Sequence, residues 1–88
     1  LLNAGDVQAQ QQCTDRDTAL EHLSKTYKEQ PIAIGLATSG GVVEVLVSGD
    51  GTSWSIIVTM PTGVTCLIAS GEGWQATVPD KTPLGLDG

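Results

Sequence analysis

Residues 59–74, TMPTGVTCLIASGEGW, contain a turn between two apolar segments and one of the two cysteines of the chain. Proline suits the first position of a turn and glycine suits a left-handed position, so the Pro-Thr-Gly of residues 61–63 predicts a three-residue hairpin loop. The segment from Val64 to about Ser70 is then the last strand of an antiparallel sheet. Cys66 lies within that strand, and its chemical role is the first question that the sequence raises.

The second cysteine is Cys13, and the chain has a single histidine, His22. These three side chains cannot fill a tetrahedral zinc site without carboxylates, and none lies near either cysteine in a recognisable pattern. A catalytic cysteine would need the histidine beside it, whereas His22 falls in a charged helical segment. We therefore expect a disulfide between Cys13 and Cys66, with no metal and no cofactor. Two buried free thiols that behave as small apolar side chains are the alternative.

A disulfide would matter here because the chain has 88 residues and forms one domain. A domain of this size buries only about 60–65% of its unfolded surface, so its core is thin. Closing a loop of about 50 residues contributes on the order of 4 kcal/mol in the chain-entropy model. Disulfides persist in oxidising compartments, which predicts a periplasmic or extracellular location.

Residues 1–12 are polar and rich in glutamine, and we expect them to form a flexible leader. The VQA before Gln10 is typical of the small-residue end of a secretory signal peptide, although no basic start or complete apolar segment precedes it. A disordered polar leader is the alternative. No apolar run reaches the ~18 residues that a membrane-spanning helix needs, so we expect no direct membrane insertion.

Residues 14–29 predict one amphipathic helix. Thr14 is a suitable N-cap, and acidic residues follow it in the first turn, where the helix dipole favours anions. Pro31 prevents the helix from continuing. The apolar residues recur at helical spacing: Ala19, Leu20, Leu23 and Tyr27.

From Ile32 onward the apolar period is two, which predicts four strands joined by loops at residues 38–41, 50–51 and 61–63. Counting outward from these loops places the large apolar residues on one face, together with Cys66. The predicted fold is α+β, with one N-terminal helix packed on this face of a four-stranded antiparallel meander. The face comprises Ile32, Ile34, Leu36, Val43, Val45, Val47, Trp54, Ile56, Val58 and Ile68. The single domain spans residues 13–74, and residues 75–88 are an irregular tail.

The opposite face carries small and polar residues with a few apolar ones, and one helix cannot cover both faces. We expect Leu46, Ile57 and Leu67 to form an exposed apolar strip that binds a partner, with Trp74 as a further anchor. The alternative is an ordinary solvated face, with Trp74 packing the tail. The free edges of strands 32–37 and 64–70 could add a partner's strand, unless the leader or the tail covers them.

Composition excludes several classes of function. The formal charge is −6, and the four basic residues form no patch, so the chain repels nucleic acid and anionic membranes. Glu44 is the only carboxylate within a predicted strand, and no second titratable group faces it, so we expect a solvated charge rather than a catalytic site.

Residues 13–74 resemble a group of small uncharacterised exported proteins of Gram-negative bacteria. The shared pattern begins with a cysteine before a short helix that ends near Y-x-E. The resemblance implies export and the disulfide, and it implies no catalytic or binding residues. The matching residues are Tyr27 and Glu29, A-x-G-L (Ala33, Gly35, Leu36), V-E-V (Val43 to Val45), T-M-P-x-G-x-T-C (Thr59 to Cys66) and A-S-G-E-x-W (Ala69 to Trp74).

The sequence contains no recognisable catalytic or metal site, and the predicted helix covers only one face of the sheet. Together these features predict a non-enzymatic exported interaction domain. Its partner would be a protein, and the domain would act as an accessory subunit of a periplasmic or envelope complex. The alternative function is that of a small inhibitor or chaperone-like binder of an exported enzyme.

Overall fold

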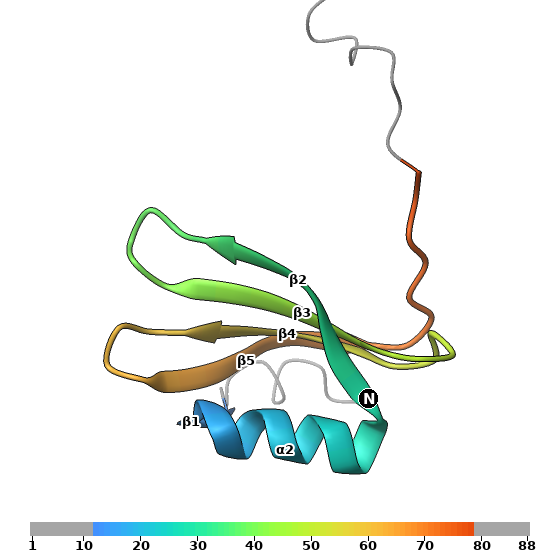
Figure 1. Cartoon of the computed structure of the whole chain (residues 1–88), viewed down its shortest axis with the longest axis horizontal. Helices are drawn as coiled ribbons and strands as arrows, with labels where there is room; N and C mark the ends of the chain where they lie inside the picture. The colour runs from blue at the N-terminus through green and yellow to red at the C-terminus, as the bar shows by residue number, and fades with distance from the viewer. Residues whose placement is uncertain (1–11, 79–88) are drawn as a thin grey trace, which may run out of the picture.

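The computed structural model describes residues 12–78, which form one helix and a five-stranded antiparallel sheet (Figure 1). The elements are β1 (Gln12–Asp15), α2 (Arg16–Tyr27), β2 (Glu29–Leu36), β3 (Val42–Ser48), β4 (Trp54–Thr59) and β5 (Val64–Gly71). The strand order is β1-β5-β4-β3-β2. The α+β class and the meander of four strands are therefore confirmed, and β1 is an additional strand that the sequence pattern did not predict. The predicted leader, apart from residue 12, and residues 79–88 of the predicted tail lie outside the described residues.

The predicted disulfide is present between Cys13 and Cys66. The two cysteines lie directly opposite each other in the pairing of β1 with β5, with their Cα atoms 4.0 Å apart. Cys13 therefore lies in a strand, three residues before the helix begins. The covalent bond holds β1 against the last strand of the meander, and this fixes the point at which the chain enters α2.

The helix is shorter than the sequence predicts, and its N-cap is Asp15 instead of Thr14. The Asp15 carboxylate accepts hydrogen bonds from the Thr18 hydroxyl at 2.7 Å and from the Thr18 backbone N–H at 3.0 Å. Both bonds lower the pKa of Asp15, and the bond from the Thr18 hydroxyl has the larger effect. Because the folded pKa is lowered, the contribution of Asp15 to stability is present above its unfolded pKa and is lost as the pH falls through the folded one. Lys28 ends the helix in the left-handed conformation, with φ of 60°.

Two of the three predicted loops give the observed register. Val58 lies opposite Cys66 across the loop of residues 61–63, and Val47 lies opposite Trp54, as predicted. The loop between Val47 and Trp54 has four residues, 49–52, instead of the predicted two, 50–51, because the Ser48 N–H donates to the Ser53 carbonyl at 2.9 Å. A bulge between Ile56 and Ile57 then shifts the pairing by one residue, so that Ile56 lies opposite Ala69 instead of Ile68.

The β2–β3 loop differs from the prediction by one residue. Ala37 N–H donates to the Gly41 carbonyl at 2.8 Å, so the loop has three residues, 38–40, instead of four. Gly40 takes a left-handed φ of 98°, as Gly63 does at the end of its own three-residue loop with φ of 97°. The shift places Leu36 opposite Val42 instead of Val43, and a shift of one residue moves side chains to the other face of the sheet.

The helix covers the face opposite to the one predicted. Leu23 of α2 packs against Leu46 and Ile57, which are 0% and 1% exposed, and Leu20 and Leu67 border this cluster. Figure 1 shows α2 on a single side of the sheet.

An ion pair also holds the helix on this face of the sheet. Arg16, the first residue of α2, donates from Nε and Nη2 to the two carboxylate oxygens of Glu44 at 3.0 and 2.8 Å. Glu44 lies on β3 and is 2% exposed, so the expectation of a solvated charge is wrong. Burying a carboxylate without a partner would cost several kcal/mol, and a bidentate arginine offsets much of that cost.

We expect the double variant Cys13→Ala/Cys66→Ala to lower the free energy of unfolding by about 2–5 kcal/mol, because the open chain gains conformational entropy when it unfolds. Replacing both cysteines avoids a free thiol. Urea denaturation followed by circular dichroism measures the change. An equal denaturation midpoint for the oxidised and the reduced wild-type protein would contradict the stabilising role of the disulfide.

Candidate functional site

The most exposed apolar side chains of the sheet lie on β2. Ile32, Ile34 and Leu36 are 54%, 69% and 81% exposed. We call these three residues, with the free backbone of the strand, the β2 edge, because β2 is the last strand on its side of the sheet. Such exposure of three large apolar residues on one strand is typical of an interaction surface.

The position of Ile34 and Leu36 follows from the three-residue loop. Ile34 lies opposite Glu44, which is buried beneath the helix, so Ile34 points to the same side of the sheet as α2. The helix nevertheless leaves it open, because β2 begins beside the end of α2 and its second half diverges from the helix (Figure 1). Ile34 and Leu36, which the sequence assigns to the core, therefore face solvent.

Among residues 12–78, nothing pairs with the backbone of the β2 edge on its outer side. Ala37 N–H bonds to the Gly41 carbonyl, and the direction of these groups alternates along an antiparallel strand. The N–H and C=O groups of Ile34 and Leu36 therefore point away from β3. β2 carries Pro31 and a bulge between Pro31 and Ala33 near its start, and both features commonly protect an edge. No lysine or proline follows from Ile32 to Leu36, so this half of the strand is unprotected. The other edge strand, β1, has only 4 residues.

The face opposite the helix carries a row of β-branched residues, namely Val43, Val45, Ile56 and Val58, which we call the valine face. These side chains are half-buried by their neighbours in the sheet, and no described segment packs over them. The valine face is thus flat and apolar, while the β2 edge offers free backbone groups in addition.

A second candidate lies on the helix side, around Glu29 at the start of β2. Glu29 is 1% exposed, and its Oε2 accepts a hydrogen bond from the Ser53 hydroxyl. Its Oε1 has no hydrogen-bond partner among residues 12–78. The sequence places Glu29 at the end of the helix predicted over residues 14–29, and nothing in its spacing indicates that it is buried.

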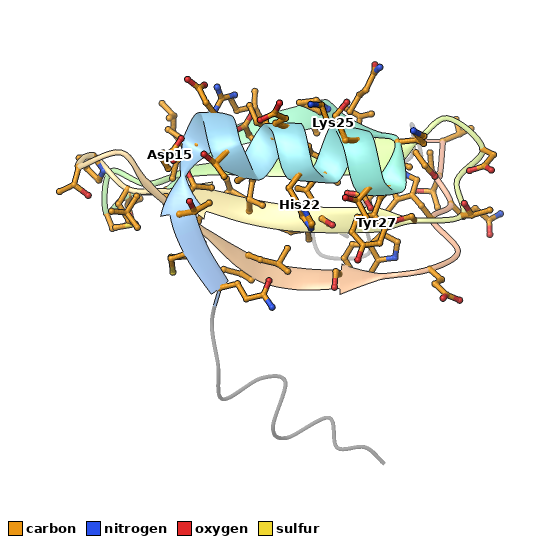
Figure 2. The ribbon with its side chains drawn as sticks, turned by 90° about the horizontal axis from the view of Figure 1, so that it is seen from below. Asp15, His22, Lys25 and Tyr27 are labelled. Carbon is orange, nitrogen blue, oxygen red and sulfur yellow. A yellow bond between two sulfur atoms is a disulfide. The ribbon has the colours of Figure 1, made fainter. Side chains whose placement is uncertain are left out.

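Glu29 borders a cleft of about 340 Å³ between the helix and strands β4 and β5, lined also by His22, Tyr27 and Trp54. His22 and Tyr27 extend from α2 toward the sheet (Figure 2), with their ring centroids 5.9 Å apart. A neighbouring cleft of about 270 Å³ lies between the helix and β1. Within the described part of the chain, no group of three or more His, Cys, Asp or Glu could hold a metal ion.

The expected strip of Leu46, Ile57 and Leu67 is not an exposed surface. The first two residues are buried beneath α2, and Leu67 packs against them, so the prediction that this strip faces solvent is wrong. The physical reason is that the helix lies on their side of the sheet. Trp74 packs against Trp54 with ring centroids 5.9 Å apart, and the backbone N–H of Trp74 donates to the Gly51 carbonyl at 2.9 Å. A contact of Trp74 with a partner stays a prediction.

No family model, curated protein or solved structure matches this chain. The resemblance to exported proteins of Gram-negative bacteria therefore stays an expectation. Among residues 12–78, no helix is both long enough and apolar enough to cross a membrane.

The core and the β2 edge are distinguished by truncation to alanine. We expect Leu46→Ala and Ile57→Ala each to lower the free energy of unfolding by about 2–5 kcal/mol, because each leaves a cavity under the helix. Leu36→Ala, at a site that is 81% exposed, should change it by less than about 0.5 kcal/mol. Urea denaturation of dilute protein provides the three values. The reverse order would contradict a core that Leu46 and Ile57 form beneath the helix.

Proposed function

We propose that this chain is a non-enzymatic exported domain that binds a protein partner by adding a strand at the β2 edge. The observation that carries the proposal is the coincidence of exposed apolar side chains and free backbone groups at Ile34 and Leu36. Main-chain hydrogen bonds would supply affinity, and pockets for alternate side chains would supply specificity. The exposed side chains of Ile34 and Leu36 lie on one face and fit this mode of recognition.

The cellular location forms part of the proposal. The disulfide suggests an oxidising compartment, and the periplasm and the extracellular space are the compartments that we propose. There the domain would be an accessory subunit of an envelope complex. Inhibition or chaperone-like binding of an exported enzyme is the alternative, and the same edge would carry it.

The Glu29 cleft favours a second function, the binding of a small cationic ligand. A buried carboxylate oxygen without a donor is costly, and an ammonium group would supply the missing hydrogen bond and opposite charge. Tyr27, an aromatic residue of a kind that attracts cations, lines the same cleft. The basic side chains of residues 12–78 have other partners: Arg16 binds Glu44, Lys25 binds Glu21, and Lys28 binds a helix carbonyl.

Strand addition is tested by affinity capture from a periplasmic extract, followed by mass spectrometry. We expect the wild-type chain to retain a stoichiometric protein partner and Leu36→Lys to lose it, because a lysine at this edge opposes pairing with an incoming strand. Val64→Lys is the matched control, since Val64 is also exposed on a strand but lies on β5, which has strands on both sides. Equal capture by all three proteins would contradict binding at the β2 edge.

Ligand binding is tested by thermal denaturation with n-butylamine, 1,4-diaminobutane or 1-butanol. We expect the amines to raise the melting temperature of the wild-type protein by several degrees, while the neutral alcohol has no effect. Glu29→Gln keeps the shape of the side chain and an acceptor for Ser53, and it should abolish the shift. An identical shift in wild type and Glu29→Gln, or no shift at all, would rule out an amine site at Glu29.

A further inference from the structure

We propose that the strand added at the β2 edge belongs to a second copy of this chain. This inference rests on the proposed function and names its partner. The two copies of β2 run antiparallel about a two-fold axis at Gly35. Their sheets then join into one sheet of ten strands, five from each copy.

The register of the pair follows from the free backbone groups. Ile34 and Leu36 point their N–H and C=O groups outward, so they are the residues that can exchange hydrogen bonds with an added strand. A two-fold axis at Gly35 places Ile34 of each copy opposite Leu36 of the other. Each such pair exchanges two hydrogen bonds, so both outward-facing residues of both copies are satisfied.

The side chains match this register as well. Ile34 and Leu36 lie on the same face of the sheet, where they are 69% and 81% exposed. In the joined sheet, the two Ile34–Leu36 pairs lie side by side and form one aliphatic cluster. Cross-strand apolar pairs of this kind stabilise antiparallel strands.

Gly35 suits the position on the axis. There the two strands meet in a non-hydrogen-bonded pair, in which the Cα atoms approach to about 4.5 Å. Glycine places no side chain between them, and a Cβ built at Gly35 meets no atom within 4 Å. The centre of the interface is therefore open to the backbone of the second copy.

Charge favours self-pairing at this edge over other parts of the molecule. The chain carries a formal charge of −6, which opposes contact between most surfaces of two copies. Residues 30–43 contain no charged side chain, so the proposed pairing brings no like charges together. The neutral segment coincides with the exposed edge strand.

The helices leave room for the second copy. Because β2 begins beside the end of α2 and then diverges from it, residues 34–36 lie away from the helix (Figure 1). The two-fold axis is perpendicular to the sheet, so both helices lie on one face at opposite ends of the paired strands. Neither helix occupies the junction.

The register is tested in the full chain by Gly35→Cys, in a buffer that contains oxidised glutathione. The two introduced thiols would form a disulfide across the axis by exchange with oxidised glutathione, which is reduced to glutathione. We expect a covalent species of twice 9.1 kDa, with peptide mapping that confirms an intact Cys13–Cys66 bond. Gly49→Cys is the control, because Gly49 is also exposed with no atom within 4 Å of a Cβ but lies in the β3–β4 loop. It should cross-link at least tenfold more slowly.

Sedimentation of the wild-type chain without cross-linking provides the second measurement. We expect a concentration-dependent dimer, with a dissociation constant that rises at least tenfold in Leu36→Lys and stays unchanged in Val64→Lys. A wild-type monomer at every concentration, or equal cross-linking of Gly35→Cys and Gly49→Cys, would overturn self-pairing. If the monomer nevertheless captures another protein, and Leu36→Lys loses it, the proposed function stands and only the identity of the partner is wrong.

Discussion

The covalent bond between Cys13 and Cys66 is the constraint on which the rest of the structure depends. It joins two residues that lie opposite each other on β1 and β5, so the chain reaches the start of α2 at a fixed place on the sheet. Arg16 follows only three residues later and binds the buried carboxylate of Glu44 on β3. Because Cys66 lies opposite Val58, the disulfide is on the valine face and not, as predicted, on the face that the helix covers. The disulfide fixes the entry of the chain into α2, and the ion pair with Glu44 holds the helix on its own face of the sheet.

This placement gives the domain a small core and a large remaining apolar surface. Beneath the helix, only Leu23, Leu46 and Ile57 are fully buried as an apolar cluster, and polar residues such as Glu29 and Thr65 fill the same layer. The valine face and the β2 edge are left without cover from the described residues. A domain with so thin a core depends on its disulfide, and its exposed apolar residues are available for binding.

The sequence predicts the helix, the four strands of the meander and most of their register, but it predicts neither β1 nor the covered face. The register across the loops predicted at residues 50–51 and 61–63 could be predicted because turn residues and apolar alternation agree, although the first of them has four residues, 49–52, instead of two. The length of the loop within residues 38–41 could not be predicted, because Thr-Ser-Gly-Gly fits a loop of either three or four residues. Its similarity to the Pro-Thr-Gly of residues 61–63 was the available signal for a three-residue loop. The burial of Glu44 depends on Arg16, 28 residues away, and no local pattern indicates such a pairing. The same is true of Glu29 and Ser53, which the fold brings together across 24 residues.

The position of the helix is tested most directly by nuclear Overhauser contacts between methyl groups in solution. The account predicts strong contacts from the methyl groups of Leu23 to those of Leu46 and Ile57, and none to those of Val45 and Val58. Contacts from Leu23 to Val45 and Val58 would place the helix on the valine face, and the proposed role of the β2 edge would then lose its structural basis.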